Sequence, residues 1–391
     1  MSAVTFPVVS GTDPLRVVQV GAGGMGRNWI RVLTESPDVE LVGLVDLDVA
    51  AAEAALTDAG LTGVSVGTSV AEVAAATGAQ AVVNVTIPAA HHPVNVEALF
   101  AGLPVLCEKP VAPTVAQGLS LAAAAEVSGQ LLMISQSRRY YRTLAAFKRE
   151  LLTLGDVGVI TTEFFKAPHF GGFREEMGHV LLVDMAIHQF DAVRYLLGRD
   201  PVSVYCEEFN PSWSWYSGDA AATAVFEFDG GARYVYTGSW CADGLETSWN
   251  GSWRANAAGG SASWDGEGDP LVERLSTADA SRAVPETGTL STVGGAADAG
   301  EEASAEEIGG ALAEFVAALR TGTVPSGEVH SNVYSLAMVE AAVLSSSTGA
   351  KVQIADVLES AYAEALSAER RPAVKAALEA WGSPLGVSRT G

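Results

Sequence analysis

Short apolar runs alternate with longer amphipathic stretches through the first third of the chain. The short runs are rich in β-branched residues and nearly free of charge, which is typical of strands covered on both faces. The longer stretches predict helices. The predicted strands are Arg16–Val20, Leu41–Val45, Val64–Val66, Ala81–Val85, Val105–Cys107 and Leu131–Ser135. Six strands separated by helices predict a doubly wound, mostly parallel α/β sheet, a Rossmann arrangement.

Capping residues mark where several of these helices begin. Ser69 is followed by Glu72, and Thr114 by Gln117, at the spacing of a capping box. An apolar, alanine-rich helix is also expected from about Val49 to Ala59, and another from Pro88 to Ala101. These signals place the helices between the strands, as a doubly wound sheet requires.

The pattern changes near Arg138, where several strands follow one another without helices between them. Helices are predicted at Thr143–Leu154 and Val180–Leu197, and Asp229-Gly-Gly231 is a hairpin turn signal. The predicted strands are Val159–Phe165, Val202–Phe209, Ala221–Phe228, Ala232–Trp240, Glu246–Ala255 and Ser261–Trp264. Consecutive strands predict a mostly antiparallel open sheet in an α+β domain. We therefore expect a dinucleotide-binding domain at 1–136 and a substrate-binding and oligomerisation domain at 137–391.

The last part of the chain is predicted to be helical after a loop. In Pro285–Ala303 the apolar residues do not recur at the spacing of a helix or a strand, so this segment is expected to be a mobile loop. Helices are predicted at Ala305–Arg320 and Ser331–Ser347, followed by a helical region over Ile354–Trp381. These C-terminal helices could pack back on the first domain.

A glycine motif directly follows the first strand. In Gly21-Ala-Gly-Gly-Met-Gly26, the first glycine would make a tight turn, the second would let the backbone approach a pyrophosphate, and the third would let the helix pack on the sheet. Asp46 ends the second strand about 20 residues later, where this motif places a carboxylate for a ribose hydroxyl. Asp46 and nearby Asp48 would repel a 2′-phosphate. The motif therefore predicts NAD rather than NADP.

Composition narrows the class of protein. The chain has 391 residues, 48% hydrophobic and 18% charged, which suits two globular domains. A formal charge of −23 disfavours nucleic acid and anionic membranes as partners and favours a small-molecule substrate. Met1–Pro14 has no signal-peptide pattern, so a cytoplasmic protein is expected. The three cysteines lack metal-ligand spacing, so we expect reduced, buried thiols and no metal site.

Two motifs outside the glycine loop could carry chemistry. Lys109 follows the fifth strand, where ligands bind in open α/β sheets, and it could hydrogen-bond a substrate oxygen or take part in proton transfer. Asp184 and His188 are four residues apart and would share one face of an α-helix, with Asp191 one turn further. A carboxylate at that spacing can orient a general-base histidine. The alternative for Lys109 is a solvated lysine in a turn. The alternative for Asp184 and His188 is a helix with polar residues at a domain interface.

These motifs together resemble the Gfo/Idh/MocA oxidoreductase family, which includes glucose-fructose oxidoreductase and inositol dehydrogenase. The similarity runs from about Arg16 to Val352. The motifs that carry it are Gly21–Gly26, Thr86-Ile-Pro88 with His92, Cys107-Glu-Lys-Pro110, Asp184 with His188, and Ser346-Ser-Thr-Gly349. Glu-Lys-Pro followed some 75 residues later by Asp-x-x-x-His is far more specific than either motif alone.

The resemblance implies a set of site residues. It assigns Lys109, Asp184 and His188 to catalysis, with His188 as the general base that takes the carbinol proton. For the cofactor it implies Gly21, Gly23, Gly24, Met25, Gly26, Asp46, Thr86, Pro88, His92, Glu108 and Lys109. For the substrate it implies Lys109, Arg139, Tyr140, His179, Asp184 and His188. An interdomain salt bridge remains the alternative for Arg139 and Tyr140, and a surface or capping role for His179; packing or capping is expected of His91.

The expected activity is hydride transfer between NAD and a secondary hydroxyl of a sugar, polyol or glycoside. One alternative is a redox-neutral glycosidase or epimerase with NAD tightly held, and another is a regulator that binds NAD without chemistry. Six tryptophans crowd the β-rich region, at positions 213, 215, 240, 249, 253 and 264. Most of them should pack the sheet or a subunit interface. The resemblance implies a homodimer or homotetramer formed through the exposed face of that sheet, and the aromatic residues fit such a use.

Overall fold

The computed structural model describes residues 4–275, 291–292 and 305–384, which form two compact units. The first unit comprises Met1–Ser137, Ala305–Leu336 and Leu358–Gly391, and the second comprises Arg138–Ser304 and Ala337–Val357. The helices α9 (Val329–Thr348) and α10 (Ile354–Ala368) each contribute residues to both units. None of the described helices is long and apolar enough to cross a membrane.

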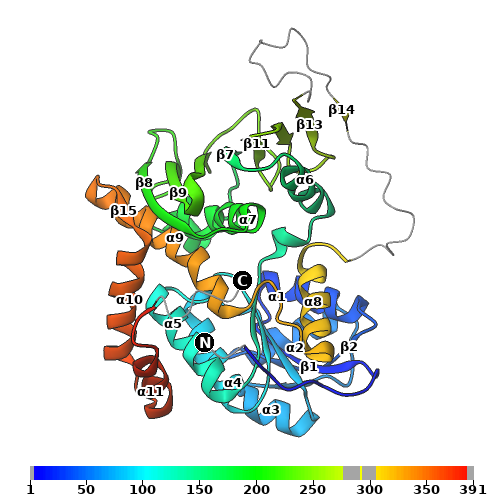
Figure 1. The fold of residues 1–391 in the computed structure, drawn as a ribbon. Helices are drawn as coiled ribbons and strands as arrows, with labels where there is room; N and C mark the ends of the chain where they lie inside the picture. The colour runs from blue at the N-terminus through cyan, green and yellow to red at the C-terminus, as the bar shows by residue number, and fades with distance from the viewer. Residues whose placement is uncertain (1–3, 276–290, 293–304, 385–391) are drawn as a thin grey trace. The chain divides into compact units, whose positions relative to one another are not determined.

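The first unit is built on a six-stranded parallel sheet in the order β3-β2-β1-β4-β5-β6. Its strands β1 and β2 are labelled in Figure 1. Its strands are β1 (Leu15–Val20), β2 (Val39–Val45), β3 (Ser65–Gly67), β4 (Ala81–Asn84), β5 (Val105–Glu108) and β6 (Leu132–Ser135). The predicted doubly wound sheet is confirmed. Strand order reverses between β1 and β4, which places a ligand-binding crevice beyond the carboxyl end of β1.

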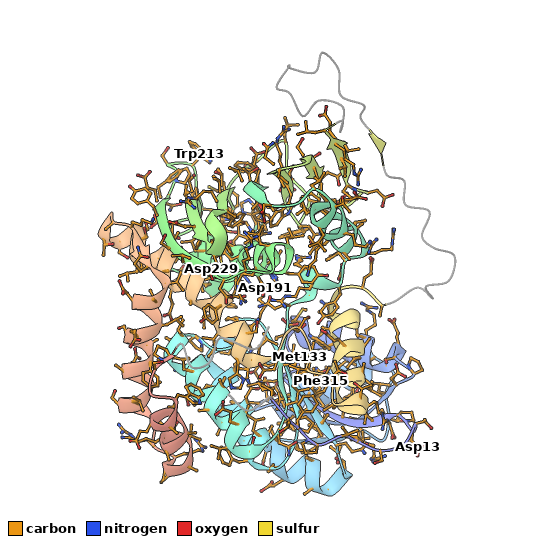
Figure 2. The ribbon with its side chains drawn as sticks, in the orientation of Figure 1. Asp13, Met133, Asp191, Trp213, Asp229 and Phe315 are labelled. Atoms are coloured by element: carbon orange, nitrogen blue, oxygen red, sulfur yellow. The ribbon has the colours of Figure 1, made fainter. Side chains whose placement is uncertain are left out.

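Helices cover both faces of this sheet. They are α1 (Gly24–Glu35), α2 (Val49–Asp58), α3 (Val70–Thr77), α4 (Pro88–Phe100), α5 (Val115–Ser128) and α8 (Glu307–Thr321). A further helix, α11 (Pro372–Trp381), packs on α5. The hydroxyls of Ser69 and Thr114 accept hydrogen bonds from backbone N–H groups three residues later, so the predicted caps are present. In Figure 2, Met133 on β6 and Phe315 on α8 belong to the buried interior of this unit.

The second unit is built on a nine-stranded mixed sheet in the order β14-β13-β12-β11-β7-β10-β9-β8-β15. All its neighbouring strands are antiparallel except β7 and β10, so the predicted mostly antiparallel sheet is confirmed. Its strands are β7 (Val157–Phe165), β8 (Pro201–Phe209), β9 (Ala221–Phe228), β10 (Arg233–Ser239), β11 (Ser252–Ala257), β12 (Gly260–Trp264), β13 (Leu271–Arg274), β14 (Ser291–Thr292) and β15 (Val352–Gln353). The turn at Asp229–Gly231 joins β9 and β10, as predicted.

Helices pack on one face of the second sheet. They are α6 (Arg142–Thr153) and α7 (Ile187–Leu197), preceded by short 3₁₀ turns at Ser137–Tyr140 and Gly172–Arg174 and by a π-helix at Leu181–Ala186. The ring of Phe190 on α7 packs edge-on against Phe226, Tyr234 and Tyr236 of the sheet. These aromatic contacts fix the helix that carries His188.

One predicted strand was misplaced, some short strands were not predicted, and one predicted loop is largely untested. The predicted strand Glu246–Ala255 begins only at Ser252, because the chain turns at Ser248–Gly251 and Gly251 has a φ of +80°. The short strands β13 and β15 were not predicted, because two to four residues show no usable alternation. The predicted loop Pro285–Ala303 lies outside the described residues except at Ser291–Thr292, which pair with β13.

Candidate active site

The glycine turn at the end of β1 is shaped by close backbone contacts. Gly21 has a φ of +102°, and a Cβ atom there would lie 2.6 Å from the carbonyl oxygen of Val85. A Cβ atom on Gly26 would collide with the carbonyl oxygen of Gly21. The buried amide of Gln19 donates to the carbonyl oxygens of both glycines, at 2.8 and 2.9 Å. This buried clamp, which the sequence motif does not include, holds the turn in place.

The N-terminus of α1 is open to a ligand. Gly23 is the N-cap residue, and neither it nor Gly24 has an atom within 4 Å of an added Cβ among the described residues. Met25, in the first turn of α1, is exposed. The first N–H groups of a helix lack partners within that helix and attract anions. This end of α1 therefore fits a pyrophosphate.

Asp46 is held beside the glycine turn. Its Oδ2 accepts a hydrogen bond from the backbone N–H of Ala22 at 2.8 Å, and its Oδ1 accepts from the N–H of Asp48 at 3.0 Å. Each carboxylate oxygen can accept a further hydrogen bond. The carboxylate of Asp48 caps α2 through the N–H of Ala51. Together with the open helix end, this fixed carboxylate fits the ribose of a dinucleotide.

The end of β5 forms a second hydrogen-bonded group in the first unit. Glu108 is 8% exposed; its Oε1 accepts from the indole N–H of Trp29 at 2.8 Å, and its Oε2 accepts from the N–H of Lys109 at 3.1 Å. The side chain of Lys109 is half-buried, and the Lys109–Pro110 peptide bond is cis. Trp29 lies on α1, so Glu108 ties the helix of the glycine motif to the loop that carries Lys109.

His91 connects the loops that follow β4 and β5. It is fully buried, with Nδ1 2.6 Å from the carbonyl oxygen of Pro110 and Nε2 3.0 Å from that of Thr86. Burial lowers its pKa, against the effect of these two hydrogen bonds. The hydroxyl of Thr86 donates to Asn84, and Pro88 starts α4. The packing role expected of His91 is therefore confirmed.

His92, expected near the cofactor, contacts the C-terminal part of the chain. Its Nε2 lies 3.0 Å from the hydroxyl of Ser120, which donates to Glu369 at 2.6 Å. Burial lowers the pKa of His92, although the charge of Glu369 opposes this. Glu369 lies between α10 and α11. In this structure the ring therefore helps to hold the C-terminal helices.

Asp184 and His188 belong to the second unit, and the helix there is not regular. Asp184 lies in the π-helix Leu181–Ala186, and His188 lies in α7. The predicted helix is therefore present, but it is π-helical up to Ala186 and α-helical from Ile187. The carboxylate of Asp184 accepts a 2.6 Å hydrogen bond from Nε of Arg174, whose guanidinium lies over the rings of Phe170 and Phe173.

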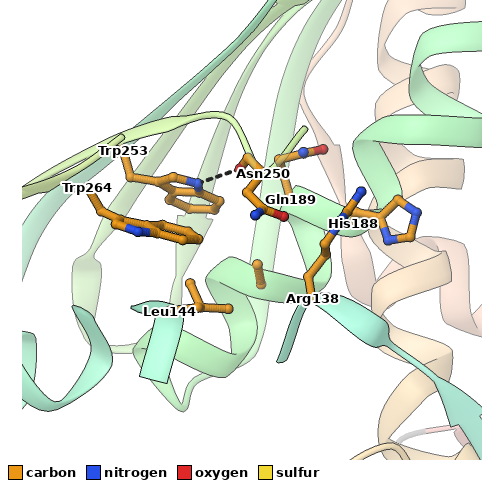
Figure 3. Close-up of a pocket in the computed structure, with 8 residues that line it drawn as sticks. Arg138, Leu144, His188, Gln189, Asn250, Trp253 and Trp264 are labelled. Atoms are coloured by element: carbon orange, nitrogen blue, oxygen red, sulfur yellow. Dashed lines mark hydrogen bonds between the residues drawn. The ribbon is translucent and has the colours of Figure 1, made fainter. Parts of the chain in front are cut away.

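His188 is 8% exposed and borders a small cavity. The other lining residues are Arg138, Leu144, Gln189, Ala192, Asn250, Trp253 and Trp264. Figure 3 shows the paired indoles on one side, with Trp253 donating to the carbonyl oxygen of Asn250 at 2.8 Å, and the imidazole of His188 pointing away from them. The cavity has a volume of about 10 Å³, which is room for about one water molecule and too small for a sugar.

The other predicted substrate residues also have partners in the second unit. The guanidinium of Arg139 makes two 2.7 Å hydrogen bonds to Asp191, and both side chains are almost fully buried. Tyr140 is half-buried at the end of a 3₁₀ turn. Nδ1 of His179 lies 2.7 Å from Oε2 of Glu208. The structure thus pairs Arg139 with Asp191 of α7 inside the second unit, so this ion pair is not the interdomain salt bridge given as the alternative.

Several residues of these clusters have no signal in the sequence. Each of these residues contacts a predicted site residue: Gln19 contacts Gly26, Trp29 contacts Glu108, Arg174 contacts Asp184, and Glu208 contacts His179. The partners in these pairs are 7 to 79 positions apart in the sequence. No local pattern links partners at such separations. The three cysteines are buried and not bonded to one another, as predicted, and burial raises the pKa of Cys206 to about 12.

Comparison with known proteins identifies both parts of the chain. Residues 15–136 match the family model described as an oxidoreductase family with an NAD-binding Rossmann fold, and residues 152–263 match the GFO/IDH/MocA C-terminal domain. An uncharacterized protein, y4oX, of Sinorhizobium fredii is 30% identical over 57% of this chain and 65% of its own length. Inositol 2-dehydrogenase 4 of Saccharopolyspora erythraea is 34% identical over 49% of this chain and 56% of its own. These matches span less than two thirds of either relative.

The fold is also found in solved structures. An oxidoreductase from Agrobacterium radiobacter, crystallised with NAD⁺, L-tartaric acid and magnesium, superposes with a TM-score of 0.75 over 88% of this chain and 99% of its own. Its sequence identity is 19%, so the similarity is one of fold.

Proposed function

Because the chain belongs to the Gfo/Idh/MocA oxidoreductase family, we propose that it transfers hydride between NAD and a secondary hydroxyl of a sugar, polyol or glycoside. The observation that carries the proposal is the carboxylate of Asp46, fixed by the N–H of Ala22 beside the open N-terminus of α1. A carboxylate there suits the two ribose hydroxyls of NAD and repels the 2′-phosphate of NADP.

We propose Lys109, Asp184 and His188 as the catalytic group. Bound NAD would supply the hydride acceptor. An imidazole nitrogen of His188 takes the proton of the hydroxyl that is oxidised, and the ammonium of Lys109 donates a hydrogen bond to the same oxygen. Arg174 holds the carboxylate of Asp184 at 2.6 Å, so that this side chain keeps one orientation.

Residues around this group would bind the rest of the substrate. Tyr140 and His179 carry donors suited to sugar hydroxyls. Arg139 is engaged by Asp191, so we assign it the task of positioning α7 and not of binding substrate directly.

The test combines a substrate panel with one variant. Purified protein with NAD or NADP is screened against sugars, inositols and glycosides while the absorbance of the reduced cofactor is followed. Net reduction of NAD, and much slower reduction of NADP, is expected. His188→Ala should lower turnover by roughly 10²–10⁴-fold while NAD still binds. Near-normal turnover of the variant would refute the assignment of the base, and conversion of substrate without net NADH would indicate redox-neutral chemistry.

We also propose that the chain forms a homodimer or homotetramer through the uncovered face of the second sheet. Tyr205 and Val225 are cross-strand partners on β8 and β9, and each is about two-fifths exposed (41% and 40%). Apolar side chains presented side by side on a sheet are suited to an interface. Light scattering should give a multimer whose mass falls toward that of one chain in Val225→Glu; a monomeric wild type would refute this.

A further inference from the structure

Three potential metal ligands converge at one end of strands β8 and β9 in the second unit. His179, Glu208 and Asp219 each offer one ligand atom, and these atoms lie within 4.8 Å of one another. His179 immediately precedes the helical segment Val180–Leu197, Glu208 is near the end of β8, and Asp219 is two residues before β9. Because they come from three separate segments, no spacing in the sequence could reveal them.

The backbone around this cluster is held before any ligand arrives. The N–H of Asp219 donates to the carbonyl oxygen of Gly178 at 2.8 Å, and a Cβ atom on Gly218 would collide with that same carbonyl. The backbone at Glu208 is also held in place, because its N–H donates a hydrogen bond to the hydroxyl of Ser346 at 3.0 Å. The three ligand positions are therefore preorganised by main-chain contacts.

The carboxylate of Glu208 is incompletely satisfied. Its side chain is 0% exposed, its Oε2 faces Nδ1 of His179 at 2.7 Å, and its Oε1 is buried without a hydrogen-bond partner among the described residues. In the part of the chain that the structure describes, no lysine or arginine forms an ion pair with Glu208 or Asp219. A buried carboxylate oxygen without a partner carries a large desolvation cost, and a cation between the three ligands would offset it.

We propose that His179, Glu208 and Asp219 bind a divalent cation of the Zn²⁺ or Mn²⁺ type. One imidazole and two carboxylates are a ligand set suited to such ions, whereas Mg²⁺ prefers oxygen ligands throughout. Three protein ligands leave a coordination position for water. The side chain of His179 is 41% exposed, so the ion can enter from solvent.

A second histidine with two carboxylates serves as a matched comparison. His330 lies 2.6 Å from Glu328 through Nδ1 and 3.1 Å from Glu126 through Nε2. The carboxylates sit on opposite ring nitrogens, so the three groups cannot converge on one ion. This cluster has the same composition but lacks the required geometry.

The experiment measures metal binding by the full chain. Protein treated with EDTA and freed of the chelator is titrated with Zn²⁺, Mn²⁺ or Mg²⁺ by calorimetry, and bound metal is counted by elemental analysis. We expect one Zn²⁺ or Mn²⁺ per chain, weaker Mg²⁺ binding, and a higher Tm with Zn²⁺. Glu208→Gln and Asp219→Asn should each weaken Zn²⁺ binding by at least roughly 10-fold. Losing a residue that only hydrogen-bonds a metal ligand already weakens binding by about that much, and these two residues would be ligands themselves. His330→Gln should bind like the wild type.

The outcomes separate a metal site from a simple ion pair. No stoichiometric uptake of Zn²⁺ or Mn²⁺ by the wild type would mean that His179 and Glu208 form an ion pair only, and the proposal would be overturned. Equal affinity in the wild type and Asp219→Asn would also overturn it. If Glu208→Gln does not fold, as judged by circular dichroism, the decision rests on Asp219→Asn, whose side chain is not fully buried. None of these readouts depends on enzymatic turnover.

Discussion

His330 should make the docking of the C-terminal helix depend on pH. Its ring lies between Glu328 and Glu126, and Glu126 also accepts a 2.9 Å hydrogen bond from the indole of Trp381 on α11. Burial alone would lower the pKa of His330, but the hydrogen bonds and charges of the two glutamates outweigh it and raise the pKa to about 9. The protonated ring therefore links α5, α9 and α11 within the first unit.

The sign and size of the effect follow from this pKa. Because the folded-state pKa lies above the usual 6.5, the stabilisation is complete below about pH 6.5 and is lost as the pH rises through about 9. At roughly 1.4 kcal/mol per pH unit the upper limit is about 3 kcal/mol. The side chain of Glu126 is 42% exposed, so solvent screens its share, and we expect about 1–2 kcal/mol.

The assay is amide hydrogen exchange of α11 at pH 6 and pH 9, corrected for intrinsic rates, because it reports local opening in a chain with two units. In the wild type the opening free energy of α11 should fall by about 1–2 kcal/mol more than in His330→Gln over this range. His169→Gln, in the second unit, controls for the loss of a histidine. The same pH dependence in the wild type and in His330→Gln would refute the reasoning.

Two further predictions concern single contacts. Gly26→Ala should weaken NAD binding by roughly 5–150-fold, corresponding to about 1–3 kcal/mol of overpacking, because the new Cβ collides with the carbonyl of Gly21; unchanged affinity in a calorimetric titration would contradict this. Asp191→Ala should destabilise the second unit by about 3–5 kcal/mol, because it leaves the buried guanidinium of Arg139 without its two 2.7 Å hydrogen bonds. Denaturant unfolding checks the loss, and a change below about 1 kcal/mol would show that the ion pair contributes little.

Much of the first unit could be predicted from the sequence. The run Arg16–Val20, the glycines from Gly21 to Gly26 and the acid at Asp46 each follow a local rule, because a strand, a tight turn and a strand end depend on neighbouring residues. The helix caps at Ser69 and Thr114 are equally local and are present. The prediction that the second region is a mostly antiparallel sheet succeeded for the same reason.

Other features could be decided only by the tertiary structure. The sequence could not indicate that Glu108 bonds Trp29, that Arg174 holds Asp184, or that the helix before His188 is a π-helix. Nor could it show that His179 faces Glu208. Periodicity and motifs record which residues are near one another along the chain. The partner of a buried charge is chosen by the folded core, where desolvation makes an unsatisfied group costly whatever its distance in sequence.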